Sequence, residues 1–305
     1  HLKQLHINNR ESYIKPENFY KGEEPNYSVI LDNYDVLKEN LNNEIVSSIL
    51  KSEIKNNLIP AIFISGSNGI GKTTSSLRAI NELQLKHGYV AFELTEINGL
   101  RAQDLEEIFN ATNVENFVLF ADNVERHTYF KELMLFRVAL SEHQFNKKIA
   151  IIAPIRENIL EKHLRNYKYK NTIQIEANHK LTENEINDLI SKLKFHKLIN
   201  VRDKQEENRI KEKIRNSYES DPYVTMLSLI ENSTLLRAIS DNLNQINPEA
   251  QKAFEYTSLL YQYKIPMPAS ILKKIINIEW NEFKENILKI DCKGLLINEI
   301  SYPID

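Results

Sequence analysis

The clearest chemical signature in the sequence is the glycine-rich segment Gly66–Thr73, which fits the pattern GxxxxGK[ST]. Its glycines allow backbone N–H groups to turn toward phosphate oxygens, and a helix that begins at its end adds partial positive charge. In this pattern Lys72 reaches the β- and γ-phosphates, and the hydroxyl of Thr73 ligates magnesium. The segment therefore predicts a binding site for ATP or ADP with Mg2+. The residues expected to contact the nucleotide here are Gly66, Ser67, Asn68, Gly69, Ile70, Gly71, Lys72, Thr73 and Thr74.

A carboxylate at the end of an apolar run is the second candidate. Asp122 follows Phe117–Ala121, which reads as a buried strand, and open α/β sheets bind their ligands at such strand ends. There Asp122 can hold the magnesium through water, and a helix-capping role is the alternative. The next residue is Asn123, where many fast ATPases place a glutamate that polarises water, and the direction of nearby Glu125 is open. We therefore expect slow hydrolysis at best, with Asp122 as a metal-binding and catalytic residue.

The third candidate is an arginine shortly after another apolar strand. Arg156 follows the predicted strand Ile149–Ala153, which a Pro break is expected to end. If this strand lies beside the strand that ends at Asp122, the guanidinium points at the γ-phosphate, and a fixed cation there distinguishes ATP from ADP. The alternative is a surface arginine paired with Glu157 or Glu161. Together with Lys72 and Asp122, Arg156 completes the predicted catalytic set.

Short apolar strands and amphipathic helices alternate between residues 61 and 176, which is typical of a parallel sheet covered on both faces. The predicted strands are Ala61–Ser65, Tyr89–Leu94, Phe117–Ala121, Ile149–Ala153 and Thr172–Ile175. The predicted helices are Asp35–Lys55, Lys72–Lys86, Leu100–Asn110 and Arg126–His143. The fold class is therefore α/β, a P-loop NTPase parallel sheet.

The flanking regions differ from this pattern, and the sequence divides into four predicted parts. Residues 1–30 are polar and irregular and read as an N-terminal connector, and residues 31–177 form the P-loop domain. Residues 178–246 read as a helical domain that opens with a capping box at Thr182 and Glu185. Residues 247–305 predict a winged helix, with a hairpin beginning near Gly294 and its end cut off. The predicted helices of the last two parts lie near residues 182–197, 204–217, 222–231, 234–244, 248–263, 269–276 and 280–290.

Composition narrows the range of partners and compartments. The net charge is -3 with no long basic block, so nothing general favours nucleic acid or an anionic membrane. No apolar run approaches the ~20 residues of a membrane helix. The single Cys292 excludes an internal disulfide and suits a reducing cytoplasm. The chain begins with His1 rather than Met, so it is open whether it is a piece of a longer protein.

The order of these motifs resembles the signal-transduction ATPases with numerous domains (STAND), a group related to the AAA+ ATPases that includes plant and animal NLR receptors. More narrowly, the chain resembles the bacterial branch used in antiphage defence. The resemblance covers roughly residues 17 to 297. The features that carry it, besides the P-loop, are Phe19–Gly22, Ala121–Asn123, Ile151–Arg156, Leu181–Leu193 and Ala253–Gln262 before Pro268.

This resemblance implies a molecular switch. Such proteins rest with ADP clamped between their domains, exchange it for ATP when a sensor binds its trigger, oligomerise, and activate an effector. Here Lys72, Thr73, Asp122 and Arg156 match the phosphate lysine, magnesium threonine, Walker B aspartate and sensor arginine of the family. Pro222 matches a proline that lies against the base or ribose, and the alternative is a simple first helical residue. The family's winged-helix histidine is not found in this sequence, because no histidine follows His196. Either the resting clamp differs here or the sequence ends before that histidine.

Two other functions stay open. One is an ORC-like AAA+ ATPase whose winged helix reads DNA, but its reading helix, Trp280–Ile290, carries two glutamates against two lysines. The other is a nucleotide-locked scaffold that never turns over ATP, which Asn123 keeps possible. Sensor and effector domains are expected outside this chain, together with self-association on activation. Adenine rather than guanine follows from the resemblance, since the sequence holds no NKxD motif.

Overall fold

The computed structural model describes residues 2–5, 13–55, 57–67, 69–95, 100–124, 129–143, 147–157, 160–161, 163, 170–178, 180–230, 247–261 and 267–283. The chain forms two compact units, His1–Ile230 and Glu231–Asp305. Each unit is described by itself below. None of the helices in the described part of the chain is both long enough and apolar enough to span a bilayer.

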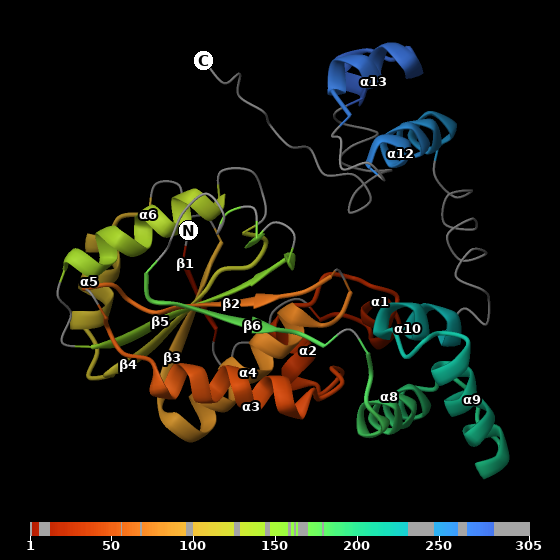
Figure 1. Cartoon of the computed structure of the whole chain (residues 1–305), viewed down its shortest axis with the longest axis horizontal. Helices are drawn as coiled ribbons and strands as arrows, with labels where there is room; N and C mark the ends of the chain where they lie inside the picture. Colours follow the sequence, from red (N-terminus) through yellow and green to blue (C-terminus); the bar gives the residue numbers. More distant parts are fainter. Residues whose placement is uncertain are drawn as a thin grey trace. The chain divides into compact units, whose positions relative to one another are not determined.

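A six-stranded sheet organises the first unit, with strand order β1-β3-β4-β5-β2-β6 (Figure 1). The edge strand β1 is antiparallel to β3, and every other pair is parallel. The strands are β1 (Leu2–Leu5), β2 (Ala61–Ser65), β3 (Tyr89–Leu94), β4 (Asn116–Phe120), β5 (Lys148–Ile155) and β6 (Thr172–Glu176). This order places β5 between β2, which leads into the glycine-rich loop, and β4, which leads to Asp122.

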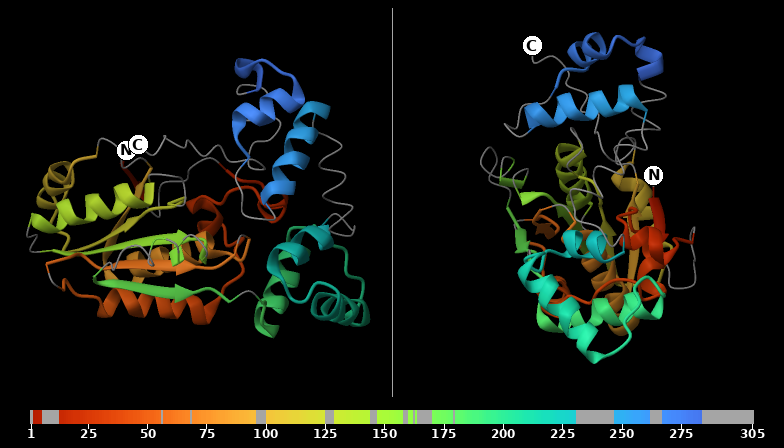
Figure 2. Two further views of the ribbon diagram at one scale, coloured as in Figure 1. Left: turned by 45° about the horizontal axis from the view of Figure 1, so that its top comes forward. Right: turned by 90° about the vertical axis from the view of Figure 1, so that its right-hand side faces the viewer.

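Helices cover both faces of this sheet (Figures 1 and 2). On one face lie α2 (Tyr27–Leu31), α3 (Glu39–Lys51) and α4 (Lys72–His87), and on the other α5 (Ala102–Asn110) and α6 (Tyr129–Glu142). Neighbouring strand residues belong to opposite cores: Val118 packs with the α3 and α4 side and Leu119 with the α5 and α6 side, both 0% exposed. Because both faces are buried, the strands read as continuous apolar runs. The predicted α/β class is confirmed.

Strand β5 continues past the expected proline break, which corrects the predicted end at Ala153. Pro154 lies inside β5 and pairs in register with Ile64 of β2. Its missing N–H costs no ladder bond to β4, because the pairing of β4 with β5 ends where Phe120 meets Ile152. Strand β5 therefore ends at Ile155, and Arg156 is the first residue after it, at the carboxyl edge of the sheet.

A buried arginine of α6 forms hydrogen bonds to the segments at the amino-terminal ends of β2 and β6. Arg137 is 1% exposed, and its guanidinium donates to the carbonyl oxygens of Ile59 at 2.6 Å, Lys170 at 2.7 Å and Asn171 at 2.8 Å. Burial lowers the pKa of this guanidinium to about 10. The three carbonyls belong to the segments that enter β2 and β6, so one side chain fixes the start of both strands.

A helical region follows β6 in the same unit. It contains α8 (Glu183–Phe195), α9 (Lys204–Asn216) and α10 (Pro222–Ile230), with α1 (Pro16–Tyr20) packed against it. The predicted capping box is confirmed: Glu185 accepts from the Thr182 backbone N–H at 2.8 Å, and Thr182 Oγ1 accepts from that of Glu185 at 3.4 Å.

The interpretation of residues 1–30 as irregular is wrong for three segments, which form β1, α1 and α2. Their apolar side chains are among the most buried in the unit, with Tyr20 1%, Tyr27 2% and Val29 0% exposed. The helices span five residues each, too short for a 3.6-residue period to show against polar neighbours. The segment is therefore packed structure at the margin of the sheet.

The second unit contains α12 (Pro248–Tyr261), α13 (Ala269–Ile276) and α14 (Trp280–Glu282). Its core is formed by Ala250, Ala253, Leu272, Ile276 and Phe283. The predicted helix at residues 234–244, the rest of the helix at 280–290 and the hairpin near Gly294 lie outside the described residues. The winged helix therefore stays a prediction.

Candidate nucleotide-binding site

The glycine-rich loop joins β2 to α4, as the motif requires. Gly71 is the N-cap of α4 and has φ 87°, which few residues other than glycine adopt. Gly69 has φ 76°, and a Cβ there would lie 2.8 Å from the Cβ of Tyr223 on α10. These glycines are therefore required by backbone conformation and, at Gly69, by a close neighbour.

The side chains of the loop turn back toward its interior. Lys72 is 8% exposed, and its Nζ donates to the backbone oxygen of Ser67 at 2.7 Å. Thr74 Oγ1 donates to the carbonyl of Gly71 at 2.9 Å. The ammonium thus lies inside the loop, where backbone N–H groups and the N-terminus of α4 also favour an anion. Of the predicted contacts in this loop, Asn68 lies outside the described residues.

Thr73 and Asp122 meet at the carboxyl edge of the sheet, although 49 positions separate them. Thr73 Oγ1 lies 3.4 Å from Asp122 Oδ1, which also accepts from the Asn123 N–H at 2.8 Å. Burial raises the pKa of the Asp122 carboxyl to about 6, and the nearby carboxylates of Glu24 and Glu93 add to the shift. A hydroxyl and a carboxylate are the hard oxygen ligands that Mg2+ prefers, so this pair fits the metal.

Arg156 meets the condition set for it from the sequence. Strand β5 lies beside β4, with Phe120 opposite Ile152, and beside β2, with Ser65 opposite Ile155. Arg156 directly follows Ile155 and is half-buried at the edge between the loop and Asp122. Its role toward a γ-phosphate stays a prediction.

A pocket opens directly beside the glycine-rich loop. Its lining is mainly apolar and aromatic, which suits a flat base or a sugar better than a phosphate. The lining residues are Phe19, Tyr20, Val36, Lys38, Gly69, Ile70, Gly71, Thr74, Leu181, Leu189, Pro222 and Met226. Pro222 is one of these lining residues, and its contact with a base or ribose stays a prediction. The pocket draws its walls from three separate parts of the sequence, the N-terminal segment, the P-loop and the helical region.

Lys38 is a pocket residue that sequence reasoning missed. It is 7% exposed, and its Nζ donates to the carbonyl of Asn178 at 3.2 Å, just after β6. Burial lowers the pKa of this lysine, and the charges of Glu185 and Asp221 oppose the shift. The sequence analysis did not select Lys38 because it belongs to no motif. It is the N-cap of α3, a helix recognised only by its buried apolar residues.

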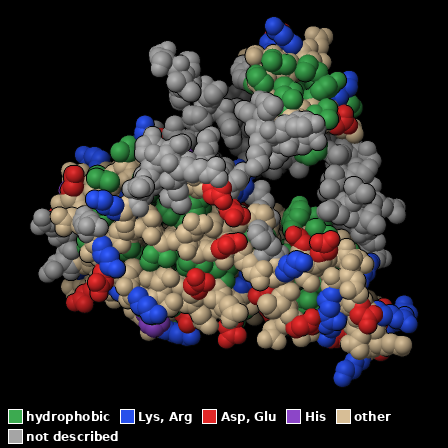
Figure 3. Space-filling model, in the orientation of Figure 1, with side chains coloured by type: hydrophobic (Ala, Val, Ile, Leu, Met, Phe, Trp, Pro, Cys, Tyr) green, Lys and Arg blue, Asp and Glu red, His purple; other side chains and the backbone are tan. Residues whose placement is uncertain are grey.

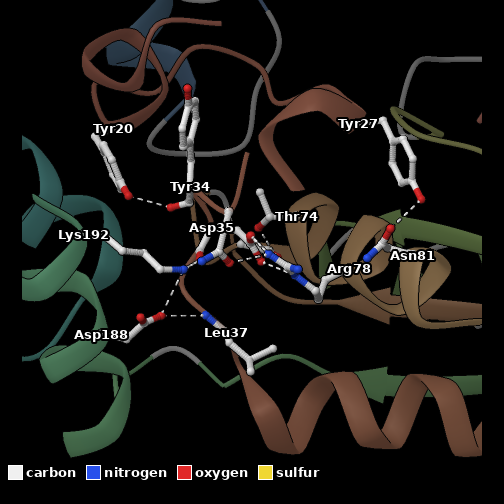
Figure 4. Close-up of polar contacts among 12 residues, drawn as sticks. Tyr20, Tyr27, Tyr34, Asp35, Leu37, Thr74, Arg78, Asn81, Asp188 and Lys192 are labelled. Carbon is white, nitrogen blue, oxygen red and sulfur yellow. Dashed lines mark hydrogen bonds and ion pairs between the residues drawn. The ribbon is translucent and has the colours of Figure 1, made fainter. Parts of the chain in front are cut away.

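Residues 33–37 form a polar junction between α4 and α8 (Figure 4). Arg78 of α4 bonds Asp35 through Nε at 2.9 Å and again through Nη2, and Asp35 is 2% exposed. From α8, Lys192 donates to the Asp35 carbonyl, and Asp188 accepts from the Leu37 N–H at 3.2 Å. The chain that leads into the pocket wall at Val36 is thus held from the P-loop helix and from the helical region.

Charge is evenly distributed on the visible surface. In Figure 3 lysine and arginine side chains alternate with aspartate and glutamate, and the described residues on that face form no continuous basic patch. The candidate DNA-reading helix lies mostly outside the described residues. The DNA-binding alternative therefore gains no support.

A glycine-rich loop between a strand and a helix, a hydroxyl–carboxylate pair at the strand ends and an adjoining apolar pocket define a P-loop NTPase. Residues 17–167 match the family described as novel STAND NTPase 5. Over this segment the chain belongs to the STAND NTPases. A comparison with curated proteins found no match.

Solved structures that are similar to this chain at low sequence identity include the following three. The Saccharomyces cerevisiae Hsp104:casein complex is 12% identical with a TM-score of 0.48, over 82% of this chain and 50% of that chain. The Thermotoga maritima RuvB Holliday junction branch migration motor is 16% identical with a TM-score of 0.40, over 86% and 89%. The Aeropyrum pernix ORC2 protein in ADPNP-ADP complexes is 10% identical with a TM-score of 0.45, over 81% and 79%. The chain thus spans half the length of the Hsp104 chain.

Proposed function

We propose that this chain binds ADP and ATP with Mg2+ and acts as a nucleotide-dependent switch with slow ATPase activity. The observation that carries the proposal is the composition of the pocket beside the P-loop. Its walls include Gly69 and Gly71 of the loop together with Leu189 and Pro222 of the helical region. A nucleotide in this site therefore touches both regions, and its exchange changes how they are held together.

Each candidate residue has a role in this proposal. Lys72 holds the β- and γ-phosphates, Thr73 and Asp122 hold Mg2+, and Arg156 contacts the γ-phosphate of ATP. The magnesium supplies charge neutralisation between the β- and γ-phosphate oxygens. Pro222 lies against the base or ribose in the pocket. The base is adenine, as the family resemblance implies.

Self-association on exchange of ADP for ATP is the proposed output, with sensor and effector domains outside this chain. The setting is bacterial antiviral defence in the cytoplasm. The support for this finer part is the family match over residues 17–167 and the motif resemblance beyond it. No nucleic acid or membrane takes part in the proposed cycle.

The test is the identity of the nucleotide that copurifies with the protein, measured by denaturation and anion exchange. We expect ADP in near-stoichiometric amount, lost in Lys72→Ala. The matched control is Lys86→Ala, which removes a lysine from the exposed end of the same helix, where it pairs with Glu82. Protein without nucleotide and with only weak ATP binding afterwards would contradict the resting switch. Equal loss in both variants would show that α4, rather than the phosphate lysine, is what the substitution disturbs.

A further inference from the structure

Among the described residues that follow β4, up to Val124, no side chain other than Asp122 can accept a proton. Asp122 accepts hydrogen bonds from the Thr73 hydroxyl and from the Asn123 N–H. The following side chain, Asn123, is an amide, which is neutral and cannot take a proton from water. Within the described part of the chain, a carboxylate that could activate water at this site must therefore come from another element.

The structure brings a carboxylate to this amide from the N-terminal segment. Asn123 Nδ2 donates to Glu24 Oε1 at 2.6 Å, across 99 positions of sequence. Asn123 has φ 55°, a left-handed conformation that asparagine tolerates better than most residues. This backbone turn and the bond from its own N–H to Asp122 direct the amide toward Glu24. The bond uses Oε1 and leaves the second carboxylate oxygen on an exposed side chain.

The segment that carries Glu24 runs along the whole nucleotide site. Phe19 and Tyr20 line the apolar pocket. Two residues after Tyr20, a Cβ at Gly22 would lie 3.4 Å from the ring of Tyr223, the residue that packs over Gly69. Glu24 then reaches the end of β4 at Asn123. The segment thus passes from the base side of the loop to the magnesium side, where the γ-phosphate of ATP would lie.

Electrostatics agrees with this path. The charge of Glu24 contributes to the raised pKa of Asp122, so the two carboxylates are close enough to interact. Glu23, its neighbour in sequence, is also exposed, but the hydrogen bond from the Asn123 amide goes to Glu24. The position of the Glu24 carboxylate is therefore specific to this one residue of the pair.

We infer that Glu24 is the carboxylate that activates water for ATP hydrolysis, with Asn123 as its positioning residue. This inference rests on the proposed nucleotide site. The Glu24 carboxylate accepts a proton from water while the water oxygen bonds to the γ-phosphorus. The bond from that phosphorus to the oxygen bridging the β-phosphate breaks, and ADP leaves with the electron pair. The proton then passes from Glu24 to solvent, so ATP and water are the only reactants.

The test compares Glu24→Gln with Glu23→Gln, which removes the same charge one residue away. Single-turnover hydrolysis and the affinity for a fluorescent ADP analogue are measured on both variants. We expect Glu24→Gln to lose roughly 10²-fold in hydrolysis rate with ADP affinity unchanged, because general-base catalysis is worth this much. Glu23→Gln should behave as wild type. Equal rates in the two variants would overturn the inference.

The positioning role of Asn123 is tested by asking whether the effect of its substitution on the hydrolysis rate requires Glu24. We expect Asn123→Ala to slow hydrolysis in the wild-type background and to have no further effect in Glu24→Gln. An equal loss in both backgrounds would show that Asn123 does not act through Glu24. A wild-type protein that binds ATP but gives no hydrolysis in a single turnover would overturn the role of Glu24 while leaving the nucleotide site intact. Absence of any nucleotide binding would instead sink the proposed function itself.

Discussion

The guanidinium of Arg78 and the carboxylate of Asp35 form a two-point ion pair between α4 and the segment that leads into the pocket wall (Figure 4). The Asp35 side chain is 3% exposed and that of Arg78 is 20% exposed. Since Lys192 of α8 also bonds the Asp35 backbone, this residue links the P-loop helix to the helical region.

Breaking this pair should be costly. We expect Arg78→Met to lower the free energy of unfolding by about 3 kcal/mol, because it leaves the Asp35 carboxylate buried without its charge partner. The matched control is Lys86→Met, which breaks the exposed pair with Glu82 and should cost less than ~1 kcal/mol. Urea unfolding of both variants measures the difference. Similar costs would show that burial of Asp35 does not set the energy of the pair.

Asp122 should destabilise the nucleotide-free fold at neutral pH. Its folded pKa of about 6 exceeds the ordinary value of 3.8, so the folded state binds the proton more tightly than the unfolded chain. The resulting stability is complete below pH 3.8 and is lost as pH rises through 6. We therefore expect Asp122→Asn to be more stable than wild type by about 2 kcal/mol at pH 7, and much less so at pH 4. Urea unfolding in EDTA at both pH values checks this, and an unchanged difference would contradict it.

The same carboxyl should make magnesium binding depend on pH. Protons compete with Mg2+ for Asp122 below pH 6, because only the carboxylate is a metal ligand. We expect the gain in ATP affinity on adding Mg2+ to fall several-fold between pH 7.5 and pH 5.5. ATP titrations with and without Mg2+ measure this gain. Asp122→Asn serves as the control and should show a small gain that changes less with pH, because only the titration of the ATP phosphates remains.

Two glycines with left-handed backbones offer a comparison inside the chain. Gly69→Ala meets both the strain of φ 76° and the Cβ of Tyr223, whereas Gly88→Ala meets only the strain of φ 66°, with nothing within 4 Å. We expect Gly88→Ala to cost about 1 kcal/mol and Gly69→Ala to cost more. Only Gly69→Ala should weaken ADP binding, which calorimetry measures. Equal effects on affinity would mean that the contact between the loop and α10 is irrelevant to the site.

The elements predicted best are those whose first and last residues are determined by the residues next to them in the sequence. Ala61–Ser65 and Tyr89–Leu94 have the expected limits, because short, mainly apolar runs bounded by proline, glycine or polar residues are typical of buried strands. Helix Ala269–Ile276 also has the expected limits. The loop at Gly66–Thr73 could be recognised for the same reason, since all its requirements fall within eight positions.

Features that depend on distant residues could not be predicted in this way. Glu24 lies in a polar segment without a periodic pattern, and Lys38 is the N-cap of α3, whose pattern marks only its apolar face. Their partners Asn123 and Asn178 lie far along the chain. Pro154 misled the reading of β5 because a proline is tolerated where a neighbouring strand has already ended. In each case the deciding neighbour is set by strand order, which no local spacing encodes.

The strand order also governs when the site can form during synthesis. Strand β2 carries the P-loop but lies between β5 and β6, so its partners come from residues 148–176. At roughly 5–20 residues per second the ribosome needs several seconds more to produce them. Until then the P-loop follows a strand, β2, that has no partner strands. An unpaired apolar strand of this kind is prone to aggregate. A nascent chain released before residue 176 should bind chaperones rather than nucleotide.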